Sequence, residues 1–187
     1  MLWKRGNMGT DYFLAFDEPD LLDRDIKCAF CISNIERKRG FFFIIEEDNK
    51  LILYYMLVKI SDYINLAAKY CEKDDDMVLE NIIKIPAFRN EYNRTYLKTK
   101  EIDNQAYVKE TINRMSKDNI CNAKNDILGL DGFSVELKLN KLDDVFYAWR
   151  TFNDKKYYYV IDFINYILEE ASINPNYRFE KAIIDIL

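Results

Sequence analysis

Two cysteines lie three residues apart, and this spacing is the first feature of the sequence that could support chemistry. Cys28 and Cys31 form a CxxC pair, which serves as a redox or zinc site when both thiols face one site. The flanking residues, IKCAFCIS (26–33), alternate like a β-strand, in which positions i and i+3 point to opposite faces. Cys71 and Cys121 stand alone and add no second CxxC. We therefore predict free, mostly buried structural thiols and no metal site.

A second stretch, LDGFSVELKLNK (130–141), places an Asp, a Gly and a Ser together like a catalytic corner. The chain contains no histidine, so Ser134 has no imidazole to activate it and no His–metal site can form. Its five glycines do not form a phosphate-binding loop. Asp131 and Gly132 are interpreted as a turn that starts a strand. The sequence thus predicts no catalytic residue set and no cofactor.

Carboxylates occur in runs, and paired carboxylates are the remaining candidates for acid–base chemistry. Runs are typical of solvated edges, whereas a catalytic pair needs two different environments, so we expect a binding surface for a basic partner. The net charge of −5 agrees with this expectation and argues against nucleic-acid binding. The predicted partner-binding residues are Glu46, Glu47, Asp48, Asp74, Asp75 and Asp76.

Aromatic residues offer an alternative recognition surface, because Tyr and Trp are favoured anchors at interfaces. They gather in VFYAWRTF (145–152) and in the run Tyr157-Tyr158-Tyr159. A strand exposes only alternate side chains, so we expect most of these rings in the core and one or two on the surface.

The elements that must position these residues are predicted from the period of the apolar residues. Apolar runs at 26–33 and 41–47 flank a polar turn and predict a hairpin. From about residue 50 to residue 71, apolar steps of three and four predict a helix. A short helix before Pro86 and an extended connection after it are expected, followed by a helix over 104–118.

The C-terminal part has the clearest periodicity. Apolar residues alternate with polar ones over 133–139 and predict a strand with one face in water, and 145–152 predicts a second strand. A helix is expected over 157–171, with Asp154 as its N-cap and Asn174-Pro175 beyond its end. Residues 1–187 therefore predict a single α+β domain, with antiparallel β-hairpins packed against several helices.

The segment from Leu130 to Leu168 resembles the C-terminal hairpin–helix of small bacterial immunity proteins. These proteins are encoded beside contact-dependent growth-inhibition toxins and other polymorphic toxins. The similar features are LDGFSVELKLNK, the aromatic strand FYAWRTF and the helix DFINYIL. The resemblance implies a protein that neutralises a cognate toxin C-terminal domain, and it carries no catalytic residue onto this chain.

We expect a cytoplasmic toxin inhibitor and not an enzyme. If the toxin is a nuclease, the acidic runs would meet its basic substrate-binding face. The apolar runs are too short to span a membrane, and the start of the chain lacks a secretory signal pattern. Two alternatives stay open: an enzyme that uses carboxylates or Cys31, and a regulatory or scaffold module that self-associates through the aromatic strand.

Overall fold

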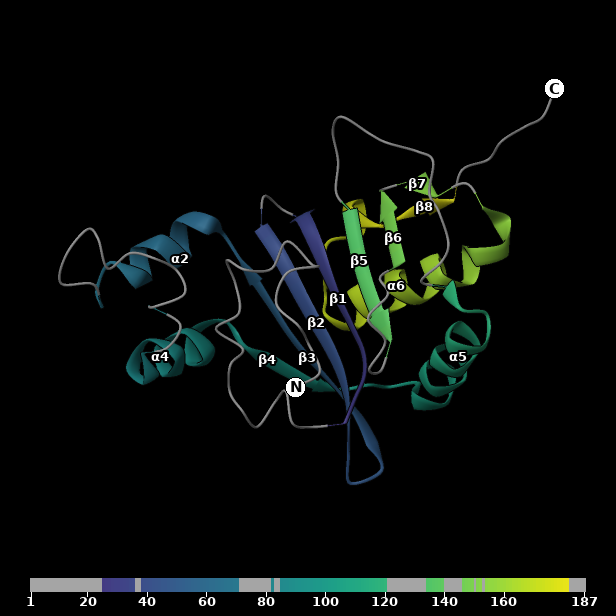
Figure 1. Cartoon of the computed structure of the whole chain (residues 1–187), viewed down its shortest axis with the longest axis horizontal. Helices are drawn as coiled ribbons and strands as arrows, with labels where there is room; N and C mark the ends of the chain where they lie inside the picture. The colour runs from purple at the N-terminus through teal and green to yellow at the C-terminus, as the bar shows by residue number, and fades with distance from the viewer. Residues whose placement is uncertain are drawn as a thin grey trace.

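An antiparallel sheet forms the centre of the protein in the computed structural model (Figure 1). The structure describes residues 25–35, 38–70, 82, 85–120, 134–139, 146–149, 151–152 and 154–181. Within these residues, six strands follow the order β4-β3-β2-β1-β5-β6, and β7 pairs with β8 in parallel. The strands are β1 (Ile26–Ile35), β2 (Lys38–Glu47), β3 (Lys50–Val58), β4 (Lys98–Glu101), β5 (Ser134–Leu139), β6 (Phe146–Trp149), β7 (Thr151–Phe152) and β8 (Glu180–Lys181).

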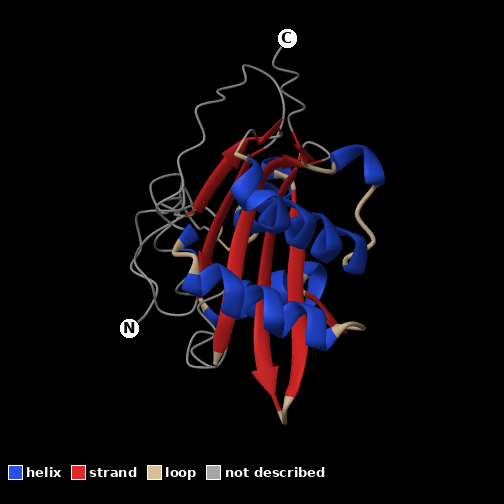
Figure 2. Cartoon of the chain, turned by 90° about the vertical axis from the view of Figure 1, so that its right-hand side faces the viewer, coloured by secondary structure: helices blue, strands red, loops and turns tan. Residues whose placement is uncertain are grey.

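Helices lie on both faces of the sheet. Helices α5 (Gln105–Lys117) and α6 (Tyr158–Glu170) bury their apolar residues against one face and cross in front of the strands in Figure 2. Helices α2 (Ile60–Ala67) and α4 (Pro86–Tyr96) contribute to a second apolar cluster on the other face. The short 3-10 helices η3 (Lys155–Tyr157) and η4 (Pro175–Tyr177) flank α6. The predicted α+β class is therefore confirmed.

Strands β1 and β2 are buried on both faces, and this explains the unbroken apolar run FFFII. Phe42 and Ile44 point into the cluster under α5 and α6. Phe41, Phe43 and Ile45 point into the cluster that holds α2 and α4. A strand covered on both sides has no water-facing positions, so its sequence loses the alternation of apolar and polar residues.

The predicted helix from residue 50 is wrong over its first half, because 50–58 forms strand β3. The chain reverses at Asp48 and Asn49, whose φ values of 48° and 65° define the left-handed two-residue turn of a tight hairpin. Glu47 pairs with Lys50 to close the ladder. The run LILYYMLV is apolar nearly throughout, so its spacing fits a helix face and a doubly covered strand equally well.

The region around Pro86 also differs from the prediction. Pro86 is the first residue of α4, a position that proline favours because the first turn of a helix needs no backbone N–H donor there. An extended connection was expected after it, and only residues 98–101 are extended. The predicted helices over 104–118 and 157–171 are confirmed by α5 and α6. Asn104 and Asp154 cap α5 and η3 through hydrogen bonds from backbone N–H groups.

Strand β5 follows the predicted alternation but does not have the expected solvent face. Val135, Leu137 and Leu139 are fully buried, as predicted. Lys138 on the opposite side is only 5 % exposed, and Glu136 is half-buried. Glu136 and Lys138 lie opposite Cys31 and Ala29 of β1, which belong to the second buried cluster, so this face of β5 continues a covered face of the sheet.

Gly40 is required by close packing inside β2. A Cβ atom at this position would lie 2.7 Å from Cε2 of Phe42 and 2.9 Å from Cδ2 of Leu57. The fully buried Phe42 ring stacks on Phe30, with centroids 4.7 Å apart, so it cannot move aside. We expect Gly40→Ala to lower the free energy of unfolding by about 2 kcal/mol, measured by urea denaturation.

A double-mutant cycle provides the control for this prediction. In a Phe42→Leu background the ring is absent, so adding Gly40→Ala should cost clearly less than it does in the wild-type chain. Equal costs in both backgrounds would show that the Phe42 ring does not cause the conflict.

Candidate protein-binding surface at the hairpin tip

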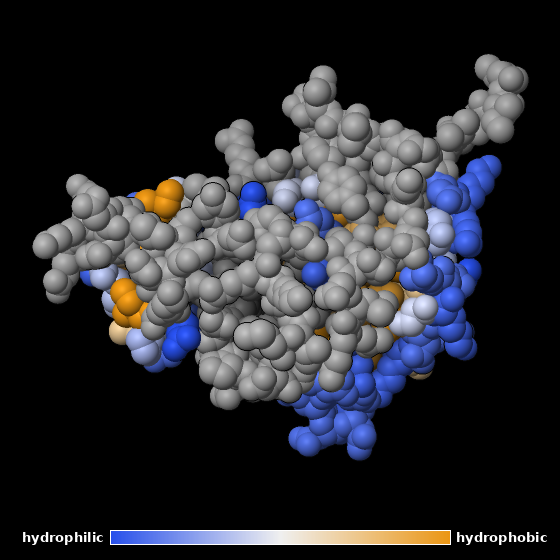
Figure 3. Space-filling view, viewed as in Figure 1, coloured by the Kyte–Doolittle hydropathy of each residue, from blue (hydrophilic) through white to orange (hydrophobic). Residues whose placement is uncertain are grey.

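The β2–β3 hairpin projects beyond the other described elements at one end of the sheet (Figures 1 and 2). Its tip consists of Glu47, Asp48, Asn49 and Lys50, and the last three are exposed. Hydrophilic residues gather there in the space-filling view (Figure 3). We call these four residues the hairpin tip. It contains two of the predicted partner-binding residues in a projecting, polar position.

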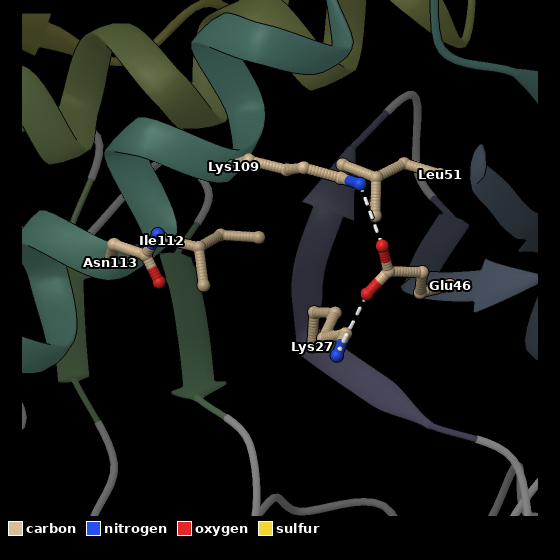
Figure 4. A pocket seen from close by; sticks show the side chains of 6 residues that line it. All are labelled: Lys27, Glu46, Leu51, Lys109, Ile112 and Asn113. Carbon is tan, nitrogen blue, oxygen red and sulfur yellow. Dashed lines mark hydrogen bonds and ion pairs between the residues drawn. The ribbon is translucent and has the colours of Figure 1, made fainter. Parts of the chain in front are cut away.

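Glu46 lies just behind the tip and is held by two lysines (Figure 4). Its Oε1 accepts a hydrogen bond from Nζ of Lys109 on α5 at 2.6 Å, and its Oε2 pairs with Nζ of Lys27 on β1 at 2.9 Å. Lys27 also contacts Asp25 at 2.6 Å. The group borders a pocket of about 140 Å³ that Leu51, Ile112 and Asn113 complete. Glu46 therefore joins α5 to the sheet.

The surrounding charges shift the pKa of Glu46. The hydrogen bond from Lys109, followed by that from Lys27, lowers the pKa of this carboxyl below its usual value. Hydrogen bonds to Asp25 and then to Glu46 raise the pKa of Lys27. A carboxyl with a lowered pKa in the folded state adds stability above its unfolded pKa, and this stability is lost as the pH falls through the folded value. The negative charge of Glu46 is therefore neutralised by two lysines of the same chain, and it contributes little to the negative potential at the protein surface.

Glu47 and Asp48 are placed differently from Glu46. Successive residues of a strand point to opposite faces, so Glu47 turns away from α5 and accepts a hydrogen bond from the Tyr54 hydroxyl at 2.8 Å. Asp48 lies in the turn and is exposed. The structure therefore does not bring the run 46–48 together as one acidic patch. The alternation of side-chain direction along β2 could have predicted from the sequence that Glu46 and Glu47 point to opposite faces of the sheet.

The tip is supported from the side by the start of α5. The backbone N–H of Leu51 donates to Oε1 of Gln105 at 3.1 Å, and Nζ of Lys109 donates to the carbonyl of Asn49 at 3.4 Å. Lys50 pairs with Glu101 of β4 at 2.9 Å. These contacts hold a hairpin end that would otherwise be free to bend. The sequence did not indicate Lys27, Lys109 or Gln105, because these partners come from distant parts of the chain.

The other predicted binding residues cannot be placed in the same way. Asp74, Asp75 and Asp76 lie outside the described residues. For the aromatic alternative, Phe146 and Tyr157 are buried, as expected for most of these rings. Tyr159 is half-buried, with the Arg114 guanidinium 3.8 Å above its ring and its hydroxyl donating to Asp118 at 2.8 Å. The side chains of residues 147–152 are also outside the described part.

The CxxC cysteines are buried and lie on opposite faces of β1, as predicted. Cys28 lies in the cluster under α5 and α6, whereas Cys31 lies on the other face, directly opposite Glu136 of β5. Burial raises the pKa of the Cys31 thiol to about 12, with Glu136 adding to the effect. Burial also raises the pKa of Glu136. Nucleophilic cysteines need the opposite shift, toward the thiolate.

Both CxxC thiols should resist alkylation in the native protein. With iodoacetamide at pH 8, we expect Cys28 and Cys31 to react at least about a hundredfold more slowly than in urea, because reaction requires local opening. Mass spectrometry of the digested protein measures the extent of alkylation at each cysteine and so distinguishes these two thiols from Cys71 and Cys121. Because the folded pKa of Cys31 is raised to about 12, the free energy of unfolding should fall progressively as the pH rises from the unfolded pKa of the thiol toward 12. Rapid native labelling of Cys31 would contradict its burial.

Taken together, the described residues define an α+β protein whose antiparallel sheet carries helices on both faces and ends in a supported, charged hairpin. Comparison with protein-family models, curated proteins and solved structures gives no match. No group of three or more Cys, Asp or Glu side chains in the described residues is arranged to hold a metal ion. No helix in this part is long and apolar enough to cross a membrane.

Proposed function

We propose that this protein is a bacterial immunity protein that binds a cognate toxin domain and blocks its active site or its access to substrate. The observation that carries the proposal is the projecting hairpin tip, which presents Glu47 and Asp48 on a supported turn. A binding protein of this kind needs a rigid surface that is complementary to its partner, and little ordering on binding. The resemblance of the C-terminal hairpin–helix to immunity proteins supplies the partner class.

The charge of the tip supports a basic partner. Glu46 pairs with Lys27 and Lys109, and Lys50 pairs with Glu101, whereas Asp48 is exposed in the turn next to the half-buried Glu47. A basic substrate-binding cleft, such as that of a nuclease, would accept a narrow hairpin with this charge. Complementary charge accelerates encounter, and a close fit slows dissociation.

Co-expression with the toxin encoded immediately upstream tests the proposal. We expect the protein to restore growth to cells that produce the toxin and to elute with the purified toxin domain as one complex. Growth arrest together with separate elution of the two proteins would overturn it. A complex of this chain with itself, unchanged by toxin, would favour the self-associating module instead.

A further inference from the structure

Strand β4 forms one edge of the six-stranded sheet, and β6 forms the other (Figure 1). Among the described strands, β3 is the one neighbour of β4 in the sheet. The side chains of Lys98, Thr99 and Glu101 are exposed, and that of Lys100 is half-buried. This edge therefore lies at the surface of the protein.

The hydrogen-bond pattern shows which backbone groups of β4 face away from β3. In an antiparallel pair, alternate residues direct both the N–H and the C=O group toward the neighbouring strand. The Ile102 N–H donates to the Leu51 carbonyl at 3.0 Å, so the even-numbered residues of β4 direct these groups toward β3. The N–H and C=O groups of Thr99 and Glu101 therefore point outward, away from the sheet.

The β2–β3 hairpin gives the same assignment independently. Glu47 and Lys50 pair across the two-residue turn, so Lys50 directs its backbone groups toward β2. In steps of two along β3, the even-numbered residues then face β2 and the odd-numbered ones face β4. Leu53 lies opposite Lys100, which again assigns the inward-facing groups of β4 to its even-numbered residues.

The outward groups of β4 have no partner in the described part of the chain. Beyond the ladder with β3, no hydrogen bond between described residues involves the backbone N–H or C=O of Thr99 or Glu101. Each of these two residues thus offers one donor and one acceptor. Exposed edge groups of this kind are a template on which an extended segment adds a further strand.

Side-chain contacts hold β4 in place without using its edge. On one face, Lys100 pairs with the carboxylate of Glu170 on α6. On the other face, Glu101 pairs with Lys50 of the hairpin tip at 2.9 Å. A strand that is already ordered loses little conformational freedom when another segment pairs with it. The contact with Lys50 also makes the edge of β4 continuous with the hairpin tip.

A second copy of this chain is a poor occupant of the edge. Two copies related by a two-fold axis would pair antiparallel, with their outward-facing residues opposite one another. The three possible registers put Thr99 opposite Thr99, Thr99 opposite Glu101, or Glu101 opposite Glu101. These registers bring Lys98 opposite Lys100, Lys100 opposite Lys100, and Glu101 opposite Glu101, respectively. Like charges lie directly opposite in every case, which destabilises a strand pair.

Lys98 indicates the charge of the segment that fits. Its ammonium group forms no ion pair or hydrogen bond with another described residue, whereas Lys100 is paired with Glu170. Lysines on an edge strand hinder unselective pairing. An acidic side chain directly opposite converts the same charge into attraction and so selects one kind of strand.

We infer that an extended segment of the toxin domain adds to the edge of β4 as a further strand, with an acidic residue opposite Lys98. The inference rests on the proposed function, and it extends the toxin contact from the hairpin tip through Lys50 and Glu101 along β4. Backbone hydrogen bonds to Thr99 and Glu101 supply affinity, and the charge of Lys98 supplies selectivity.

Amide hydrogen exchange, followed by NMR on the isotope-labelled full chain, tests the pairing directly. In the free protein, the Thr99 and Glu101 amides should exchange quickly, whereas the ladder with β3 protects the Lys100 amide. Saturation with the purified toxin domain should slow the exchange of both outward amides at least about a hundredfold.

The other outcomes of this experiment separate the two proposals. A toxin complex in which the Thr99 and Glu101 amides still exchange quickly would overturn the inference and leave the proposed function intact. Absence of any complex would overturn both. Protection of these amides in the free protein that increases with protein concentration would assign the edge to a second copy and refute the inference.

Thr99→Pro removes one outward donor without removing a ladder bond. Because this N–H faces away from β3 and edge strands tolerate proline, Tm should change by no more than about 3 °C. Toxin binding should weaken at least about tenfold, measured by surface plasmon resonance. The matched control is Thr99→Val, which keeps the N–H group and the β-branched shape and should bind like the wild type. A folded Thr99→Pro variant with wild-type affinity would overturn the inference, and hydrogen exchange decides it if the variant loses its fold.

A charge reversal tests the predicted acidic residue of the partner. Lys98→Glu should weaken toxin binding about fivefold or more, because it places like charges opposite one another. Lys155→Glu changes the net charge equally at an exposed position of η3, and it should leave the affinity within about twofold of the wild type. Equal effects of the two substitutions would refute the pairing at Lys98.

Discussion

Glu170→Ala is expected to lower the free energy of unfolding by about 3 kcal/mol, which corresponds to a fall of roughly 6–12 °C in Tm for a chain of this size. The side chain of Glu170 is only 5 % exposed, at the last turn of α6. Its carboxylate accepts hydrogen bonds from Lys100 Nζ and the Tyr166 hydroxyl, and from the Asp103 N–H at 3.4 Å. Removing it takes this acceptor from the Tyr166 hydroxyl and the Asp103 N–H and leaves Lys100 paired with Asp103 at 3.2 Å.

The neighbouring residue provides a matched control. Glu169 has the same charge and the same place near the end of α6, but its side chain is 69 % exposed and pairs with Arg178 on the surface. Glu169→Ala should change the free energy of unfolding by no more than about 0.5 kcal/mol. Thermal denaturation of both variants measures the difference. Equal losses would mean that charge near the helix end, and not the buried network, determines stability.

The pattern of buried and exposed faces decides which elements could be predicted from the sequence. The regular spacing of apolar residues in 104–118 and 157–171 predicted α5 and α6, because each helix has one buried face and one solvent-exposed face. Residues 50–58 are covered on both faces, so their period carries no information that distinguishes a strand from a helix. The turn at Asp48 and Asn49 was the available signal, but it lacks the glycine that usually identifies such turns.

The candidate surface was predictable only in part for a related reason. A run of carboxylates in the sequence says nothing about which lysine will meet each one. Lys109, which pairs with Glu46, comes from a helix 63 residues further along the chain. Such a contact depends on how α5 packs against the sheet, and that packing involves the whole core.

Neutralising the hairpin tip should weaken toxin binding about a hundredfold, close to 2.7 kcal/mol, if the tip enters a basic cleft. The variant is Glu47→Gln combined with Asp48→Asn. Gln keeps an acceptor for the Tyr54 hydroxyl, and Asn tolerates the left-handed backbone of the turn, so the hairpin should keep its shape. Binding of the purified toxin domain is measured by surface plasmon resonance at several salt concentrations. The wild-type association rate should fall with salt more steeply than that of the variant.

The control removes two charges from another surface. Glu169→Gln with Asp162→Asn changes the net charge equally, on exposed positions of α6. If both double variants bind alike, net charge alone steers the partner and the tip is not the contact. If the tip variant binds the toxin with wild-type affinity, the tip is not the contact. Neutralising Asp74, Asp75 and Asp76 should then weaken toxin binding instead. Because Glu46 is matched by Lys27 and Lys109, Glu46→Gln should affect toxin binding less than the tip variant does.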